Sequence, residues 1–314
     1  MQPIPEVAPV SEDRAFPLDG VLERNRIGPG LTIAVGLILG FVAFQGISLV
    51  VLVAVLAATG QLTEMAGMDT STLVATFASE FLIANTVGQF LGLLGLGWLF
   101  ARLHTSRPAA MLRLRGSGLA ITLLSLAGLV ALFPIVQWAG SIMDGLPWPE
   151  GIREFEQMQM DLIEQVLATN LGFFFTLFTM AITPALCEEL FFRGYIQRQA
   201  ERMFSGWLAA IIFSGVVFGL YHFRITQALP LSMLGVYMAY VVWRSNSLVP
   251  GILVHLANNG FAVALGAWIS SSDGMSLEDI ETMDVPIYIV LGAVVVFGLI
   301  VRTMHRMGRA EEGA

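Results

Sequence analysis

The chain of 314 residues is unusually apolar: hydrophobic residues make up 56% of it, charged residues only 13%, and the mean hydropathy is +0.75. A soluble domain has about a quarter charged residues, so this composition excludes an ordinary soluble protein and indicates a membrane protein. The net charge is −8, and all 16 basic residues are arginine, a usage that favours a GC-rich bacterial genome. The single cysteine, Cys187, excludes an intramolecular disulfide.

Long apolar stretches divide the chain, and a bilayer core of ~30 Å needs roughly 20 apolar residues of helix. We predict an all-α fold, a polytopic membrane helical bundle. Residues 1–30 are expected to form a polar cytoplasmic tail, 31–304 the transmembrane bundle and 305–314 a second cytoplasmic tail. Eight spanning helices are predicted, at about 31–59, 75–101, 118–140, 171–192, 206–223, 227–243, 247–270 and 284–303.

The arginines predict the orientation of these helices. With a cytoplasmic N-terminus and eight alternating spans, 14 of the 16 arginines fall in inner segments, and only Arg153 and Arg224 fall in outer ones. Basic residues are retained on the cytoplasmic side of membranes. We therefore predict that both termini lie inside and that the protein is a multi-pass protein of a bacterial cell membrane.

The segment 152–167 has a helical pattern of its own within a predicted outer loop. Apolar side chains recur at positions 152, 155, 158, 162 and 166. That spacing predicts an amphipathic helix lying on the outer membrane surface. A helix that binds a partner protein is the alternative.

Three charges interrupt the apolar stretch ALCEELFFRGY, residues 185–195. Charged side chains inside a membrane are costly, and those present usually have a function or a partner. Glu189 and Arg193 are four residues apart with the glutamate first, the favoured order for an ion pair on one helix face. Glu188 points about 100° away from Glu189 and has no basic residue four positions later. We predict a structural Glu189–Arg193 pair and an unpaired Glu188 suited to general-base catalysis.

Two of the four histidines also lie in apolar segments. His222 and His255 are predicted inside the membrane, and Asn259 shares a helix face with His255 at a spacing of four residues. A lone histidine in such a place is often a packing residue, but two histidines and an unpaired glutamate favour a site. His104 and His305 lie in or near basic segments, so we expect both to be solvated.

Glu188 and His222 are predicted to face each other. If the fourth helix turns into the fifth at Ser205, Glu188 lies 17 residues before the turn and His222 lies 17 residues after it. Equal distances from the turn of an antiparallel hairpin mean equal depth. Matching the depth of His255 requires a hairpin that projects into the cytosol and a fifth helix that ends near His222, which a protein-lined cavity tolerates. We therefore expect a cavity open to the cytosol.

Two chemistries suit a carboxylate, two imidazoles and an amide in one cavity. The carboxylate or an imidazole can take a proton from a water molecule that attacks a carbonyl, while the remaining donors stabilise the oxyanion. Alternatively, Glu188, His222 and His255 can hold a divalent metal such as zinc with one open position. The H-E-x-x-H signature of soluble zinc proteases is absent. Cys187 is disfavoured as a nucleophile because two neighbouring carboxylates suppress its thiolate.

These motifs together resemble a known family. Glu188-Glu189-x-x-x-Arg193, Phe218-x-x-x-His222 and His255-x-x-x-Asn259 occur in this order on successive apolar segments. The pattern resembles the CAAX prenyl proteases and bacteriocin-processing intramembrane proteases, over about residues 170–265. Each short motif is weak alone, and the three together are specific.

The resemblance implies an intramembrane endopeptidase acting on a membrane peptide or protein. It implies that Glu188 and His222 activate the water and that His255 and Asn259 bind the oxyanion. It implies that Glu189 and Arg193 support the structure. The substrates implied are prenylated or bacteriocin-like peptides, and the first three helices and the last match no motif.

Two other classes of function remain open. A non-catalytic scaffold or immunity protein would keep the motifs and act by binding. A proton-coupled transporter would also bury carboxylates and histidines, and Glu80, Asn85 and Gln89 are the residues that suit it best. Transporters usually show an internal repeat, and none is apparent. The chain has no basic patch beyond the expected inner loops, which excludes nucleic acid as a partner.

Overall fold

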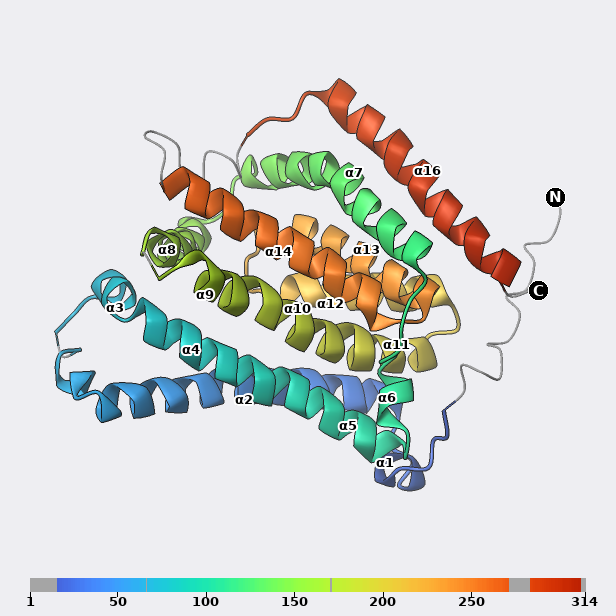
Figure 1. Ribbon diagram of the computed structural model, residues 1–314, viewed down its shortest axis with the longest axis horizontal. Coiled ribbons are helices and arrows are strands. Elements are labelled where there is room, and N and C mark those ends of the chain that lie inside the picture. The colour runs from blue at the N-terminus through green and yellow to red at the C-terminus, as the bar shows by residue number, and fades with distance from the viewer. Residues whose placement is uncertain (1–15, 66, 170, 271–282, 312–314) are drawn as a thin grey trace.

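The computed structural model describes residues 16–311 apart from 66, 170 and 271–282. Residues 1–15 and 312–314 of the predicted tails, and most of the predicted outer loop 271–283, lie outside the described residues. The described part is all-helical, as predicted (Figure 1). Its α-helices are α1 Val21–Arg24, α2 Pro29–Ala58, α3 Thr70–Thr76, α4 Ala78–Gly88, α5 Leu96–His104, α6 Pro108–Met111, α7 Leu119–Asp144, α8 Glu150–Ala168, α9 Phe173–Leu177, α10 Thr183–Glu188, α11 Gln197–Met203, α12 Trp207–Leu220, α13 Ala228–Ser245, α14 Leu248–Ser270 and α16 Ile287–Glu311.

Three π-helical segments and one short 3₁₀ turn are the other helical elements of the described residues. The π-helical segments Gln89–Gly95, Phe178–Ile182 and Glu189–Ile196 join α-helices end to end, and the 3₁₀ turn is Gln61–Thr63. Two of the long helical rods are therefore composite. The second rod, Ala78–His104, consists of α4, a π segment and α5, and the fourth rod, Phe173–Met203, contains α9, α10, α11 and two π segments.

Each of the eight predicted apolar stretches is helical, but within the described residues only six helices are long and apolar enough to cross a membrane. These are Pro29–Ala58, Ala78–His104, Leu119–Asp144, Phe173–Met203, Leu248–Ile269 and Ile287–Met307. By length and composition, the described helices therefore supply six of the eight predicted spans. α12 has 14 residues, or ~21 Å at 1.5 Å per residue, and falls short of a bilayer core. α13 has 18 residues and is less apolar, because it carries polar side chains and Arg244.

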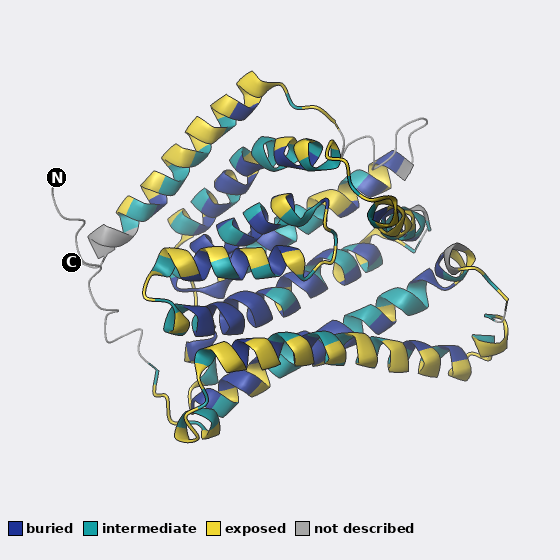
Figure 2. Ribbon diagram, turned by 180° about the vertical axis from the view of Figure 1, so that it is seen from behind, coloured by how far each residue is buried: buried dark blue, intermediate teal, exposed yellow. Residues whose placement is uncertain are grey.

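Burial is greatest at the centre of the bundle (Figure 2). Arg193, Tyr195, Phe191 and Phe192 are among the largest fully buried side chains, and all belong to the fourth rod. The outer faces of α2, α12 and α16 remain exposed and apolar. An apolar exterior is expected of a bundle surrounded by lipid, so the chain is a multi-pass membrane protein.

α12 and α13 pack closely because glycines lie at their contact. A Cβ atom on Gly215 would come within 2.3 Å of the backbone nitrogen of Val236, and one on Gly235 within 2.6 Å of the Gly215 carbonyl oxygen. Small residues allow helix backbones in membranes to approach this closely. The contact places α12, and the turn that follows it, beside the fourth rod.

The segment before α2 packs onto the bundle. The Gly20 N–H donates to the His104 carbonyl, at 2.9 Å, and His104 Nδ1 lies 2.6 Å from the carboxylate of Glu23 on α1. Arg202 also pairs with Glu23, at 2.7 Å. The prediction that His104 is solvated is wrong, since its side chain is fully buried. Its burial depends on residues about 80 positions away, which a local pattern does not show.

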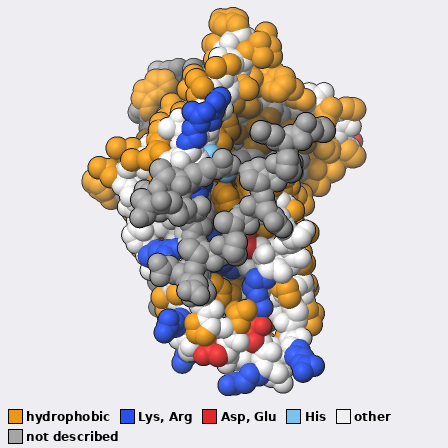
Figure 3. Space-filling view, turned by 90° about the vertical axis from the view of Figure 1, so that its right-hand side faces the viewer, with side chains coloured by type: hydrophobic (Ala, Val, Ile, Leu, Met, Phe, Trp, Pro, Cys, Tyr) orange, Lys and Arg blue, Asp and Glu red, His pale blue; other side chains and the backbone are white. Residues whose placement is uncertain are grey.

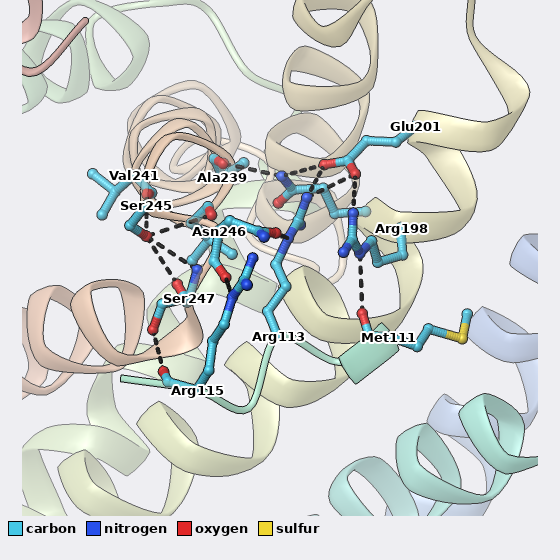
Figure 4. A network of polar contacts seen from close by, with 12 residues as sticks. Met111, Arg113, Arg115, Arg198, Glu201, Ala239, Val241, Ser245, Asn246 and Ser247 are labelled. Carbon is cyan, nitrogen blue, oxygen red and sulfur yellow. Dashed lines mark hydrogen bonds and ion pairs between the residues drawn. The ribbon is translucent and has the colours of Figure 1, made fainter. Parts of the chain in front are cut away.

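A polar network joins the loop after α6 to α11 and to the turn between α13 and α14 (Figure 4). Arg113 donates to both carboxylate oxygens of Glu201 at 2.7 Å and to the side chain of Asn246 at 3.2 Å. Arg198 donates to the Met111 carbonyl and to Glu201, and Ser247 donates to the Arg115 carbonyl. Arginine in such forked contacts fixes geometry as well as charge. The network holds this end of the fourth rod against its neighbours.

Charged side chains gather at the end of the bundle that carries α1, α6 and α11. Figure 3 looks onto this end, and most of the charged side chains visible there are basic. α3 and α8 lie at the opposite end (Figure 1). The predicted orientation requires basic residues to be concentrated at one end. Which end of the bundle faces the cytosol stays a prediction.

Candidate active site

The fourth rod is irregular where its polar residues lie. π-helical segments flank α10, and the second of them begins at Glu189, directly after Glu188. Such segments inside α-helices often occur at functional sites. Pro184 contributes to the irregularity, because proline has no N–H to donate to the Met180 carbonyl four residues earlier. Asn259 of α14 donates its side-chain amide to that carbonyl, at 3.3 Å.

The predicted Glu189–Arg193 ion pair is present in the structure. Arg193 Nη1 donates to Glu189 Oε1 at 2.7 Å, and both side chains are fully buried. Arg193 Nη2 also donates to the Gly235 carbonyl at 3.2 Å. His255 Nδ1 lies 3.1 Å from the same Glu189 oxygen. Because a carboxylate oxygen accepts, we assign the proton to Nδ1 of His255. Glu189 is therefore shared between a guanidinium and an imidazole.

Phe218 of α12 lies between the two histidines. Its ring contacts His222 edge-on, with 4.7 Å between centroids, and His255 edge-on at 5.8 Å. The Arg193 guanidinium lies over the same ring, 4.0 Å from its centroid. A cation over an aromatic face is favourable, and more so when desolvated. Phe218 thus separates the buried Glu189 cluster from the turn that carries His222.

Glu188 and His222 line one cavity of about 730 Å³. The other lining residues come from α2, α8, the two composite rods and the end of α12: Phe41, Phe44, Gln45, Leu93, Gly151, Ile152, Phe155, Glu156, Gln159, Phe192, Leu220, Tyr221, Phe223 and Ile225. The sequence prediction that Glu188 and His222 come together agrees with this placement. His255 and Asn259 are not among the described residues that line the cavity.

The two cavity residues have different surroundings. Glu188 is half-buried, and its Oε2 is a buried oxygen without a hydrogen-bond partner among the described residues. His222 is exposed and lies just beyond the end of α12, so a helix that ends near His222 is observed as expected. Its Nδ1 is 2.8 Å from the Phe218 carbonyl. A carbonyl only accepts, so Nδ1 carries the proton and the neutral ring keeps its lone pair on Nε2.

The cavity lies on the α8 side of the fourth rod. Residues from Gly151 to Gln159 of α8 form one of its walls. The sequence places the α8 segment outside the membrane, yet it also predicts a cavity open to the cytosol. In this arrangement the two expectations point to opposite ends of the bundle. The side from which a substrate enters therefore stays a prediction.

The apolar spacing of α8 does not mark a single face turned to the bundle. Glu156, Met160 and Val166 are buried, whereas Phe155 and Met158 are largely exposed. An interfacial helix exposes apolar side chains to lipid, so the apolar spacing marks two faces of α8. Glu156 is a site residue that the pattern missed. The available signal was its position four residues after Ile152, on the same helical face.

The residues proposed as zinc ligands do not form a metal site in this arrangement. No group of three His, Cys, Asp or Glu side chains in the described part of the chain is placed to hold one metal ion. The Glu189 contact at Nδ1 leaves Nε2 of His255 open, but Phe218 lies between this histidine and His222. Glu188, His222 and His255 are therefore not gathered as three ligands in this arrangement, and we derive no step from a metal.

Residues 170–261 match the family model described as type II CAAX prenyl endopeptidase, Rce1-like. The match covers less than a third of the chain and shows what this segment is similar to. It contains the Glu188, His222, His255 and Asn259 motifs, which confirms the resemblance seen in the sequence. Neither a curated protein nor a solved structure matches the chain. The similarity supports a membrane endopeptidase in general.

The transporter-like residues lie away from this cavity. Glu80 accepts a hydrogen bond from the neighbouring Ser79 at 2.7 Å, and Gln89 donates to Asn85 within the same rod at 2.8 Å. None of the three lines the cavity described above. Their local bonds are typical of polar groups that pack within a helix.

Proposed function

We propose that the protein is an intramembrane endopeptidase that hydrolyses a peptide bond of a membrane-associated peptide or protein. The observation that carries the proposal is the presence of Glu188 and His222 on the wall of one cavity, inside the segment that matches the Rce1-like family model. A cavity of about 730 Å³ accommodates a short stretch of extended peptide and a water molecule. Its walls are mainly apolar, which suits a substrate delivered from a membrane.

In the proposed reaction a water molecule binds between Glu188 and His222. His222 accepts a hydrogen bond from the water through Nε2, because Nδ1 is held by the Phe218 carbonyl. Glu188 takes the proton as the water oxygen attacks the peptide carbonyl carbon, and it then transfers this proton to the leaving amine. One water is consumed, and an acid and an amine are released. The carboxylate of Glu188 on the cavity wall supplies the acceptor that this step requires.

The other family residues have supporting places in the proposal. Glu189 and Arg193 hold the fourth rod against α13 and α14 and fix the ring of His255. The resemblance assigns oxyanion binding to His255 and Asn259. Both would have to reach the cavity when substrate binds, because Asn259 bonds to the Met180 carbonyl and His255 is buried beside Phe218.

The resemblance and the composition also suggest the substrate classes to test and the membrane in which the protein lies. Prenylated peptides and bacteriocin-like peptides are the two substrate classes to compare. The proposal places the protein in a bacterial cell membrane with both termini in the cytosol, following the arginine distribution.

Peptide cleavage by the detergent-purified protein tests the proposal. A library with prenylated and unmodified members is incubated with the wild type, Glu188→Ala and His222→Ala, and the metal content of each sample is measured. We expect both variants to lose activity by about 10²–10⁴-fold, the contribution of a general base. Their unfolding midpoints should stay close to the wild type, because Glu188 is half-buried and His222 is exposed.

Glu80→Gln is the matched control. It removes a half-buried glutamate of another rod that bonds to Ser79, and it should cleave at the wild-type rate. Cleavage by Glu188→Ala at the wild-type rate would refute the assignment of the base. A well-folded wild type that cuts no peptide would favour the hypothesis of a non-catalytic scaffold.

A further inference from the structure

α12 holds only the start of the turn that carries His222, through bonds to its last carbonyls. α12 ends at Leu220, and the His222 and Phe223 N–H groups donate to carbonyls three residues earlier, at 3.4 and 3.1 Å. Phe223 has a φ of +55°, in the left-handed region that bulky residues rarely adopt. A backbone of this kind persists only where its surroundings impose it.

Two contacts from outside α12 hold this turn, which spans residues 221–227. The Tyr221 hydroxyl donates to the Leu37 carbonyl of α2 at 3.1 Å. At the other end, the Thr226 N–H donates to Glu156 Oε1 at 2.8 Å, and the Thr226 hydroxyl donates to Glu156 Oε2. Glu156 is therefore bound through both carboxylate oxygens to one residue of the turn.

The burial of Glu156 also calls for an explanation. Its side chain and that of Thr226 are each 7% exposed, although α8 is otherwise rich in solvated carboxylates. Burying a carboxylate is costly unless hydrogen bonds compensate for lost water. Glu156 also lines the cavity that contains Glu188 and His222. It is thus a buried charge placed between α8, the cavity and the His222 turn.

We propose that Glu156 is a positioning residue that fixes the His222 turn through Thr226 and so makes α8 part of the active site. This inference rests on the proposed function, in which His222 orients the water. Glu156 lies outside the family match, which begins at residue 170. Its carboxylate holds Thr226, and the turn in between keeps the His222 ring with Nδ1 on the Phe218 carbonyl. Misplacing such a group by about 1 Å can lower a rate by about 100-fold.

The test compares four variants: Glu156→Ala, Thr226→Val, Thr226→Ser and Glu154→Gln. Glu156→Ala removes both contacts, Thr226→Val removes only the hydroxyl, and Thr226→Ser restores it. Glu154→Gln is the matched control, because Glu154 is exposed on the same helix and does not line the cavity. Peptide cleavage gives kcat and KM, and ¹⁵N NMR of labelled histidines, with His222→Gln to assign the signal, reports which ring nitrogen of His222 carries the proton.

We expect kcat to fall by about 10- to 100-fold in Glu156→Ala, with a smaller change in KM. Thr226→Val should lose less activity, and Thr226→Ser and Glu154→Gln should match the wild type. The His222 ring should lose its single Nδ1–H tautomer in Glu156→Ala and keep it in the two matched variants. If Glu156→Ala fails to fold, the Thr226→Val and Thr226→Ser pair carries the same comparison.

Two results separate the possible failures. Wild-type kcat and an unchanged His222 signal in Glu156→Ala and Thr226→Val would overturn the positioning role while leaving the protease intact. A folded wild type without peptidase activity would refute the proposed function, and the NMR comparison would still show whether Glu156 fixes the His222 ring.

Discussion

The two adjacent glutamates of the fourth rod lie in opposite surroundings. Glu189 is fully buried, pairs with Arg193 at 2.7 Å and contacts His255 at 3.1 Å. Glu188 is half-buried at the cavity; Oε2 of each glutamate lacks a hydrogen-bond partner among the described residues, so the contrast lies in the contacts that Glu189 makes through Oε1. A charge with two partners in a dry interior holds elements together. A charge without a partner at a cavity is available for chemistry.

This contrast extends to the histidines. His255 is buried, and a carboxylate fixes one of its ring nitrogens, whereas His222 is exposed in a turn and leaves Nε2 free. The family motif therefore separates into a structural cluster around Glu189 and a reactive pair at the cavity wall. Phe218 packs against both histidines and separates the structural cluster from the reactive pair.

The largest stability effect is expected in the structural cluster. Arg193→Met removes the guanidinium and leaves His255 as the only hydrogen-bonding partner of Glu189 among the described residues, which should lower the free energy of unfolding by about 3–5 kcal/mol. The double variant Glu189→Gln/Arg193→Met removes both charges and should recover part of that loss. Denaturant unfolding in detergent measures both. A double variant less stable than Arg193→Met would show that the pair does not act as a unit.

A smaller effect is expected at Gly251, where α14 passes close to Glu189. A Cβ atom there would lie 2.5 Å from Val242 Cγ2 and 3.0 Å from Glu189 Oε2. Gly251→Ala should therefore destabilise the protein by about 1–3 kcal/mol, the usual cost of overpacking. Gly292→Ala on α16 is the control, because a Cβ there has no neighbour within 4 Å. Equal unfolding midpoints for the two variants would contradict the close approach.

The smallest effect is expected far from both regions, at Asp19. Hydrogen bonds from Ser106, including its N–H at 2.7 Å, lower the pKa of the Asp19 carboxyl. A lowered pKa in the folded state gives stability above the unfolded value of about 3.9, and this stability is lost as the pH falls through the folded pKa. Asp19→Asn should lower the melting temperature slightly at pH 7 and by less at pH 3. The same difference at both pH values would exclude ionisation as its cause.

Much of the architecture could be predicted from the sequence. The apolar runs located the rods because a helix in lipid must be apolar over its length. The i, i+4 spacing predicted the Glu189–Arg193 contact, and equal distances from a turn brought Glu188 and His222 to one cavity. These features depend on neighbours along one rod or across one hairpin, so local spacing contains the information.

Other features depend on distant parts of the chain and were missed. His104 is buried by Glu23 and Tyr195, 81 and 91 positions away, and Glu156 bonds to Thr226, 70 positions away. The short α12 was counted as a full span because the apolar run continues past its end into the 221–227 turn. The π-helical geometry after Glu188 was not expected, since apolar spacing does not distinguish it from an α-helix. Substrate and cavity direction are likewise not encoded in a local pattern.

The division of labour between the two glutamates is tested most directly by comparing Glu188→Gln with Glu189→Gln in one preparation. Peptide cleavage and detergent unfolding are measured on both. We predict that Glu188→Gln loses at least about 100-fold in kcat and keeps the wild-type unfolding midpoint. Glu189→Gln should have a much lower unfolding midpoint, because Arg193 is left charged and buried without its carboxylate. Wild-type cleavage by Glu188→Gln, or equal losses of stability in both variants, would contradict the account.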